Sequence, residues 1–490
     1  MNDVRRGGRI EVRADDPGLT GHAGLAAIGD LARKLDLIGL IDGELARERR
    51  AGPVKARRRG VSPGELVVSI AECQLVGGAF FDHLEDQRAD TAAAELRAVA
   101  DVPSAPAALQ NAKRFRRVHC QRVERAMAQA GERLDETLGR DPAEPVTIDL
   151  DATHVIVYGR SKEGAARCRT GQWSYAPHLA FWSQRGRTLT AELVGGNQER
   201  LSGKECARIA SRAIGLLPAG HGPVDFRIDS AYYAVELLQR LRRERARFSV
   251  SVPRSSAMWT ALHRIEENAW IDALQMDGAQ VAETVYRPGG WTHEPLRLIV
   301  RRVPFRAEQI AKLRGSRRLA TIHPDQLQMA LDGKLDSVYG YSFILTDHYH
   351  QHTAWVEHHH RHRAQIEERL KDTKTGQALR HLPSGDINAN RVWLTASMLA
   401  LNLTAWCCDL SPAAAASGTT TEPRLPLRRH AHTLRRILFN IPARIIHTGR
   451  IEGLCGMTKR SGHMMCGAPL SRISRSASDF LTRPNSRYSR

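Results

Sequence analysis

The sequence predicts an α/β protein with a helical N-terminal region, a core of strands and helices, and a β-rich insertion within that core. Two observations predict this class. Residues 18–135 carry apolar residues at helical spacing, whereas from residue 146 apolar and polar residues alternate as in half-buried strands. Between residues 146 and 254 the expected order is three strands, a helix, a strand, a helix and a strand. A ribonuclease-H-like core has this order, although several other α/β folds share parts of it.

Turn and helix-start signals bound the core elements. The first strand, VTIDLDAT, places Val146, Ile148 and Leu150 on one face. A turn at residues 184–186 joins the second and third strands. The expected elements are strand 146–153, two strands within 175–197, helix 203–218, strand 223–229, helix 234–248 and strand 248–253.

Changes of pattern divide the chain into regions. Residues 255–346 read mostly as strands and turns, and they interrupt the core before its last helix. The segment SPAAAASGTTTEP has the composition of a linker, and the basic region after it ends in a stretch that we expect to be disordered. The expected regions are a helical domain (1–140), the core's first part (141–254), the insertion (255–346), the core's second part (347–410), the linker (411–423) and a basic, partly disordered C-terminal region (424–490).

The charge of the chain favours a polyanionic partner. It carries 72 Lys and Arg against 53 Asp and Glu, a net charge of +19, which suits nucleic acid or an anionic membrane surface. The most apolar stretch, residues 392–410, contains polar residues and is expected to be a buried core helix, with a membrane span as the weaker alternative. The start lacks the apolar run of a signal peptide, and eight cysteines without a CxxC pair indicate the reducing cytoplasm.

Basic residues cluster in the helical region. The loop RERRAGPVKARRRG lies between two expected helices, and a later helix carries five more cations. This pattern is typical of a DNA-contacting helical domain, and it is equally typical of a solvated basic face, because no signature fixes a DNA-binding motif. The five cations of the later helix are Lys113, Arg114, Arg116, Arg117 and Arg122.

Three acids stand where a ribonuclease-H-like core would bring them together. Asp151 ends the first strand, Asp229 ends the fourth, and Glu367 lies on the helix after the insertion. Phosphodiester transfer uses two hard cations about 4 Å apart, held by carboxylates, which suits Mg²⁺ or Mn²⁺. Taken singly, an Asp at a strand end is also a common cap or turn residue, and Glu367 could simply pair with Arg363 on the helix surface.

The segment HHRHRAQIEERLKDTK carries a further pattern. Arg363, Glu367 and Lys374 fit the spacing Tyr-x2-Arg-x3-Glu-x6-Lys of insertion-sequence transposases. Together with DLDATH, RIDSAYY and HLPSGDINANRVWL, these residues make the chain resemble the insertion sequence 1380 family of DDE transposases over roughly residues 18–450. The resemblance implies a ribonuclease-H-like core that cuts and joins the ends of its own mobile element.

The resemblance also implies roles for single residues. Asp151, Asp229 and Glu367 would hold Mg²⁺ or Mn²⁺, and Arg363 and Lys374, on the same helical face as Glu367, would hold phosphate. Asp149 and Asp151 share one face of their strand, so periodicity does not separate them; the family pattern of Asp followed two positions later by Thr favours Asp151. Asp149 would then be an outer-shell or solvent-facing acid.

The implied partners are DNA at the terminal inverted repeats of the element and target DNA, with a homodimer on paired ends, in the bacterial cytoplasm at the nucleoid. The chain departs from the pattern at His360, which stands in place of the motif tyrosine and is expected to contact phosphate, and in the region after residue 452. Two alternatives follow: an inactive DNA-binding relic that represses the element, and a metal-dependent nuclease without strand transfer.

Two further features have competing interpretations. His358 and His362 are spaced to chelate a metal, but no third partner accompanies them, so phosphate contact or plain surface is the favoured hypothesis over structural zinc. Trp270 and Trp291 in the insertion are expected to pack in the core, with stacking on an unpaired base as the alternative.

Overall fold

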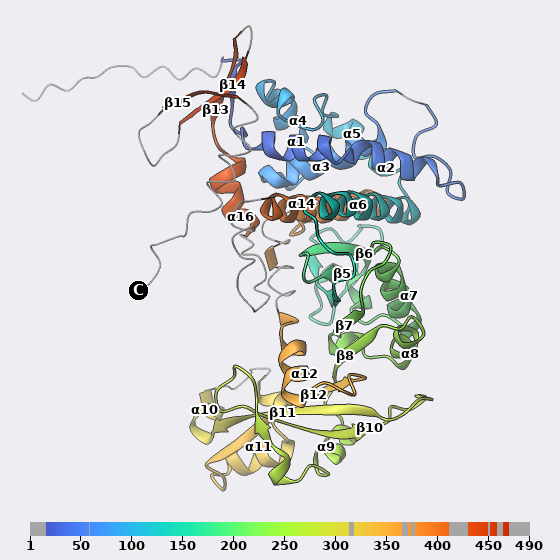
Figure 1. The fold of residues 1–490 in the computed structure, drawn as a ribbon, viewed down its shortest axis with the longest axis vertical. Coiled ribbons are helices and arrows are strands. Elements are labelled where there is room, and N and C mark those ends of the chain that lie inside the picture. Colours follow the sequence, from blue (N-terminus) through green and yellow to red (C-terminus); the bar gives the residue numbers. More distant parts are fainter. Residues whose placement is uncertain are drawn as a thin grey trace, which may run out of the picture.

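The structure is a computed structural model in which a helical layer lies at one end of a long mixed sheet (Figure 1). The residues that it describes are 16–57, 59–312, 318–364, 371–372, 374, 378–410, 430–448, 451–457 and 464–469. The predicted linker, residues 411–423, lies outside the described residues, as does most of the predicted disordered tail.

Six helices form the N-terminal part of the helical layer. Helix α3 shows how their ends are fixed: Ser62 and Glu65 form a capping box, Pro63 follows, and Gly77 ends the helix at φ 117°. The apolar faces of these helices share one core with α14. The helices are α1 (Leu25–Lys34), α2 (Leu37–Ala46), α3 (Pro63–Val76), α4 (His83–Ala89), α5 (Ala105–Ala112) and α6 (Arg117–Thr137).

The apolar stretch near residue 400 forms helix α14 (Ile387–Asp409), which is buried along most of its length. Three of its polar side chains are hydrogen-bonded within the protein: Thr395 and Thr404 donate to carbonyls one turn back, and Asn402 bonds both backbone groups of Thr188. The prediction of a buried core helix is confirmed. Within the described part of the chain, no helix is both long and apolar enough to cross a membrane.

The central strands form a mixed sheet. Their order is β6-β5-β2-β7-β8, with β2 antiparallel to β5 and parallel to β7, and β7 parallel to β8. Helices α7 (Gly203–Ile214) and α8 (Val235–Arg243) pack against each other and share a core with these strands. The strands are β2 (Val146–Ala152), β5 (Trp173–Trp182), β6 (Arg187–Gly195), β7 (Val224–Ile228) and β8 (Arg247–Val252). Three short strands also pair at the edges: β3 (Val155–Ile156) and β4 (Ala166–Arg167) with β5, and β9 (Ile271–Asp272) with β10.

The β-rich insertion continues this sheet. Strand β12 pairs antiparallel with β8, and β11 and β10 follow outward. The insertion therefore covers the edge of β8, which would otherwise expose unpaired backbone groups. Its elements are α9 (Ser256–Leu262), β10 (Gln280–Tyr286), β11 (Leu296–Arg306), α10 (Ala307–Lys312), α11 (Pro324–Leu331) and β12 (Ser337–Thr346).

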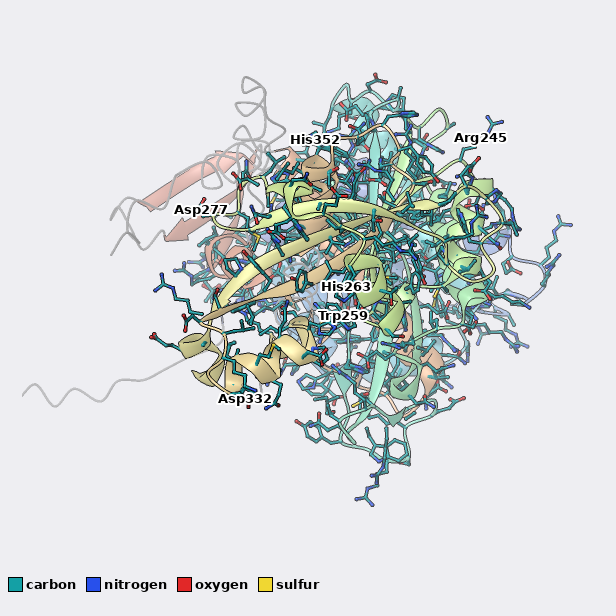
Figure 2. The ribbon with its side chains drawn as sticks, turned by 90° about the horizontal axis from the view of Figure 1, so that it is seen from below. Arg245, Trp259, His263, Asp277, Asp332 and His352 are labelled. Atoms are coloured by element: carbon teal, nitrogen blue, oxygen red, sulfur yellow. The ribbon has the colours of Figure 1, made fainter. Side chains whose placement is uncertain are left out.

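The tryptophans of the insertion are packed. Figure 2 shows this end of the molecule, with Trp259 of α9 and His263 directly after that helix; the ring of Trp259 lies 5.3 Å from that of Phe343 on β12. Trp291 is buried, as expected for core packing, and its indole donates to the Glu294 carbonyl. Trp270 is covered by the Arg302 guanidinium, 4.2 Å from the ring centre.

The C-terminal region adds a second, small sheet. Strand β1 (Leu19–Thr20) pairs with β13 (Ala443–Thr448), which pairs with β14 (Ile451–Met457). Helix α16 (Ala431–Leu434) precedes β13 in the chain. Strand β15 (Met464–Pro469) completes the sheet, although the sequence predicts disorder there. Backbone pairing with β14 orders this short segment, MMCGAP, which the basic composition of the surrounding tail does not indicate.

Candidate active site

Two predicted acids meet at one edge of the central sheet. Strands β2 and β7 are parallel, and Leu150 is aligned with Ile228. The next residue on each strand is Asp151 and Asp229, so parallel pairing brings both carboxylates to the carboxyl ends of neighbouring strands. The side chain of Asp151 is 14% exposed and that of Asp229 34% exposed, so both can be reached from solvent.

Arg363 lies between these two acids. Its Nη1 is 3.7 Å from the Asp151 carboxylate and its Nη2 is 3.6 Å from the Asp229 carboxylate. Lys374 also lies within electrostatic range of Asp151: burial lowers the pKa of Lys374, and the Asp151 charge partly offsets this shift. Four of the six predicted site residues are therefore brought together, and a fifth, Glu367, lies outside the described residues.

The sixth predicted residue, His360, has a different environment. It lies on α12 (Thr353–Arg361) and is buried, with Nδ1 hydrogen-bonded to Ser249 and Nε2 to Ser251, both on β8. Burial lowers the pKa of His360 to about 3, so the ring is neutral. A neutral imidazole with both nitrogens occupied has no hydrogen bond left for phosphate, which argues against the predicted contact. The ring instead attaches α12 to the sheet.

Asp149 is separated from the candidate site by a specific partner. Both of its carboxylate oxygens accept from Arg227, at 2.7 and 2.8 Å, and its side chain is 1% exposed. Burial raises the pKa of Asp149, and the Arg227 guanidinium opposes that shift. Of the two alternatives for Asp149, the solvent-facing acid is thus wrong, because the residue is a buried partner of Arg227 one step behind Asp151; the outer-shell role stays a prediction.

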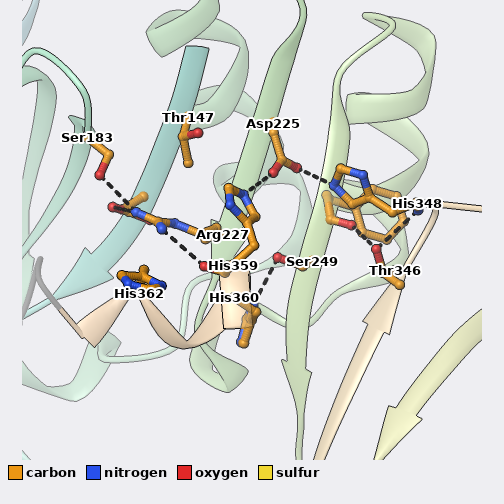
Figure 3. A network of polar contacts seen from close by, with 12 residues as sticks. Thr147, Ser183, Asp225, Arg227, Ser249, Thr346, His348, His359, His360 and His362 are labelled. Carbon is orange, nitrogen blue, oxygen red and sulfur yellow. Dashed lines mark hydrogen bonds and ion pairs between the residues drawn. The ribbon is translucent and has the colours of Figure 1, made fainter. Parts of the chain in front are cut away.

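A second polar cluster joins the same strands to α12, and sequence reasoning missed it (Figure 3). The Asp225 carboxylate accepts from His348 at 2.9 Å and from His359 at 2.6 Å. Burial raises the pKa of Asp225, but the two imidazole hydrogen bonds outweigh it and hold the pKa below its usual range. The ring of His359 also stacks on Trp355, at 4.8 Å. The only signal in the sequence was an acid on the strand VDFRI and a run of histidines far along the chain.

The remaining histidines of α12 make local contacts. His358 and His362 face each other with ring centres 4.3 Å apart, while His358 bonds Gln275 and His362 bonds the His358 carbonyl. In the described ranges, no group of three or more His, Cys, Asp or Glu side chains is arranged to hold a metal ion. The third acid predicted beside Asp151 and Asp229 is Glu367, which those ranges do not include.

The donor set at the sheet edge fits a hard divalent cation. Asp151 and Asp229 offer carboxylate oxygens only, which suit Mg²⁺ or Mn²⁺ better than zinc. The guanidinium of Arg363 already places one positive charge near both acids. Enzymes that transfer phosphoryl groups with divalent ions use carboxylate ligands of this kind.

Comparison with known proteins identifies the family. The model of the transposase DDE domain group 1 matches residues 3–313 and 332–454, and the chain belongs to this family. Among solved structures, a piggyBac transposase synaptic complex with hairpin DNA is similar at 8% sequence identity and a TM-score of 0.39, covering 86% of this chain and 80% of that one. No curated protein matches the chain.

Proposed function

We propose that the chain is the transposase of a bacterial insertion sequence of the 1380 family, which binds the terminal inverted repeats of its element, cleaves the DNA ends and joins them to target DNA. The observation that carries this proposal is the convergence of Asp151, Asp229 and Arg363 at one sheet edge in a member of a DDE transposase family. The strand order β6-β5-β2-β7-β8 supports a ribonuclease-H-like core.

In this proposal the acids and the cations have separate tasks. Asp151, Asp229 and Glu367 would hold Mg²⁺ or Mn²⁺, which when bound activate the attacking oxygen and stabilise the leaving oxygen. Arg363 lies against the same carboxylates, so its guanidinium would be able to turn from them to the scissile phosphate. Lys374, in electrostatic range of Asp151, would add a second contact to that phosphate.

The remaining parts of the proposal concern partners. The helical N-terminal region would bind DNA, and two copies of the chain would bring paired ends together, because both ends of an element must be cut in concert. The proposal keeps the predicted region boundaries, at residues 140, 254, 346, 410 and 423. It also places the protein in the bacterial cytoplasm at the nucleoid.

A cleavage assay on the element's own ends tests the proposal. The substrate is a labelled duplex bearing the inverted repeat that flanks the gene, incubated with Mg²⁺ or Mn²⁺. The wild-type protein is expected to nick and join this duplex, while Asp229→Ala binds it and leaves it uncut. Metal-dependent cleavage retained by Asp229→Ala would overturn the site. Binding without nicking by the wild type would identify a relic that represses the element, and nicks without joined product a nuclease.

A further inference from the structure

A large basic hollow lies within the helical layer, formed by three segments of the chain. Its volume is about 1320 Å³. One wall is formed by residues 51–57 and 59 of the loop after α2, and the second is the α5–α6 junction, residues 110–117. The third wall combines residues 163–164 with the start of α14. No residue of the predicted catalytic set lines it.

The charges in this hollow are almost all positive. Eight lysines and arginines line it, against one acid, Glu163. Five of the cations are exposed and have no acidic partner among the described residues. These five are Arg57, Arg59, Lys113, Arg114 and Arg116.

The arginines of the folded interior behave differently. Arg187 is paired with Asp135 through two hydrogen bonds, and Arg227 is paired with Asp149 in the same way. Five cations facing one space repel each other, and without an anionic ligand that repulsion opposes folding. A polyanion in the hollow would relieve it.

The basic loop is held in place by hydrogen bonds. Glu48 accepts from the backbone of Arg50 and Ala51, and its side chain pairs with Arg122 of α6. The Gly52 carbonyl contacts the His119 ring, also on α6, at 2.9 Å. The loop is therefore attached to the helix whose N-terminal end forms the second wall, so the two sets of cations are presented together. Preformed walls reduce the entropy lost on binding.

The third wall connects the hollow to the candidate active site through the chain. Residues 163–164 follow the strand that carries Asp151, and α14 follows the segment that carries Lys374. The two sides of this wall are joined, because Glu163 accepts from the backbone of Ile387 at 3.2 Å and donates its own backbone N–H to Gly385. A ligand in the hollow would thus rest on two segments that are hydrogen-bonded to each other.

We propose that this hollow is a binding surface for the phosphate backbone of duplex DNA, with Arg57, Arg59, Lys113, Arg114 and Arg116 as its phosphate contacts. The proposal rests on the proposed function, which makes DNA the substrate, and adds the surface that holds it. Exposed arginines and lysines contact phosphate through charge and independently of base sequence. The hollow therefore supplies affinity and position, and sequence recognition lies elsewhere.

Salt dependence of DNA binding tests the proposal on the full-length protein. The probe is a fluorescein-labelled duplex of about 30 base pairs, followed by anisotropy between about 50 and 300 mM NaCl. Each phosphate contact adds about 0.9 to the slope of log affinity against log salt. Arg57→Ala/Arg114→Ala is expected to lower that slope by about 1.8 and to weaken binding roughly fifty-fold near 100 mM salt.

Two controls accompany this variant. Arg247→Ala/Arg287→Ala removes two exposed arginines outside the hollow and is expected to keep the wild-type slope. Arg57→Lys/Arg114→Lys retains the charge and is expected to restore most of the slope, which a folding defect would not allow. Equal slopes for the two alanine pairs would overturn the proposal. It would also be overturned if Arg57→Ala/Arg114→Ala lowered the slope only for an RNA duplex of equal length. If DNA binding depends on the hollow but the wild-type protein never cleaves, the proposed function is overturned and the binding surface is not.

Discussion

Arg227 holds Asp149 by two hydrogen bonds between the neighbouring parallel strands β2 and β7. The same guanidinium donates to the carbonyl of His359 on α12. One buried ion pair therefore fixes both the strands that end in the candidate acids and the helix that precedes Arg363. It also separates the two aspartates of DLDATH: Asp149 has a structural partner, and Asp151 remains at the sheet edge beside Asp229.

Removing one half of this pair is expected to destabilise the protein strongly. Arg227→Met leaves the Asp149 carboxylate buried without its counter-charge, which costs about 3–5 kcal/mol. Urea unfolding followed by tryptophan fluorescence measures the loss. The double variant Asp149→Leu/Arg227→Met removes both charges and is expected to recover most of the stability. A loss below about 1 kcal/mol in Arg227→Met would contradict the ion pair's structural role.

The same Asp→Asn substitution at Asp149 and at Asp151 should have opposite effects on stability and on cleavage. Asp151→Asn is expected to abolish cleavage of the element's ends with little change in stability, because Asp151 is partly exposed and adjoins Asp229. Asp149→Asn is expected to lose stability by about 2–4 kcal/mol, since Arg227 loses its counter-charge, while the folded fraction still cleaves. Cleavage and thermal unfolding are measured on both proteins. The reverse pattern would assign the catalytic role to Asp149.

The sequence predicted the central strands and their end residues because both depend on local signals. Alternation of apolar residues located β2 and β7, and the first acid after each run was at the end of a strand. Their side-by-side position then followed from parallel pairing. The insertion was predicted as β-rich, but its attachment to the edge of β8 depends on pairing between distant segments, which periodicity does not encode.

The polar network around Asp225 could not be predicted for the same reason. His348 and His359 lie 123 and 134 residues away along the chain, and only the packing of α12 on the sheet brings them to the carboxylate. His360 shows the opposite case. A motif position indicated phosphate binding, yet the two serines of β8 occupy its ring nitrogens. A motif gives the spacing of residues along a helix, but the surface on which that helix packs decides which side chains remain available.

Arg363 is expected to compete with a divalent ion for the two acids. Arg363→Met removes a positive charge 3.6–3.7 Å from both carboxylates, so their attraction for a cation increases. Without DNA, this variant should bind Mn²⁺ about tenfold more tightly, which corresponds to about 1.4 kcal/mol. Loss of the free Mn²⁺ electron paramagnetic resonance signal measures the affinity.

Arg361→Met is the matched control for this measurement, because Arg361 ends α12 two residues before Arg363 and pairs with Glu357 instead of the two acids. Arg361→Met is expected to leave Mn²⁺ affinity unchanged. Asp229→Asn is expected to weaken Mn²⁺ binding. Unchanged or weaker Mn²⁺ binding by Arg363→Met would show that the guanidinium does not share the carboxylates with the ion.

The Asp225 cluster should make stability depend on acid pH. The pKa of the Asp225 carboxyl is held below that of an unfolded aspartate, about 3.9, so the folded state binds fewer protons near that pH. The stabilisation is therefore fully present above about pH 5 and is lost as the pH falls towards the folded pKa. Asp225→Asn is expected to lower the unfolding free energy at pH 7 by about 1.5–3 kcal/mol, because it removes charge-assisted hydrogen bonds.

The same variant should flatten the pH profile. Between about pH 5 and pH 2, its unfolding free energy should fall less steeply than that of the wild type, as measured by urea titrations at each pH. Asp277→Asn, at an exposed acid of the insertion, serves as the control and should keep the wild-type slope (Figure 2). If Asp225→Asn and the wild type lose stability in parallel across this range, the imidazole hydrogen bonds do not lower the carboxyl pKa, and the attachment of α12 to the sheet depends on Arg227 and His360 instead.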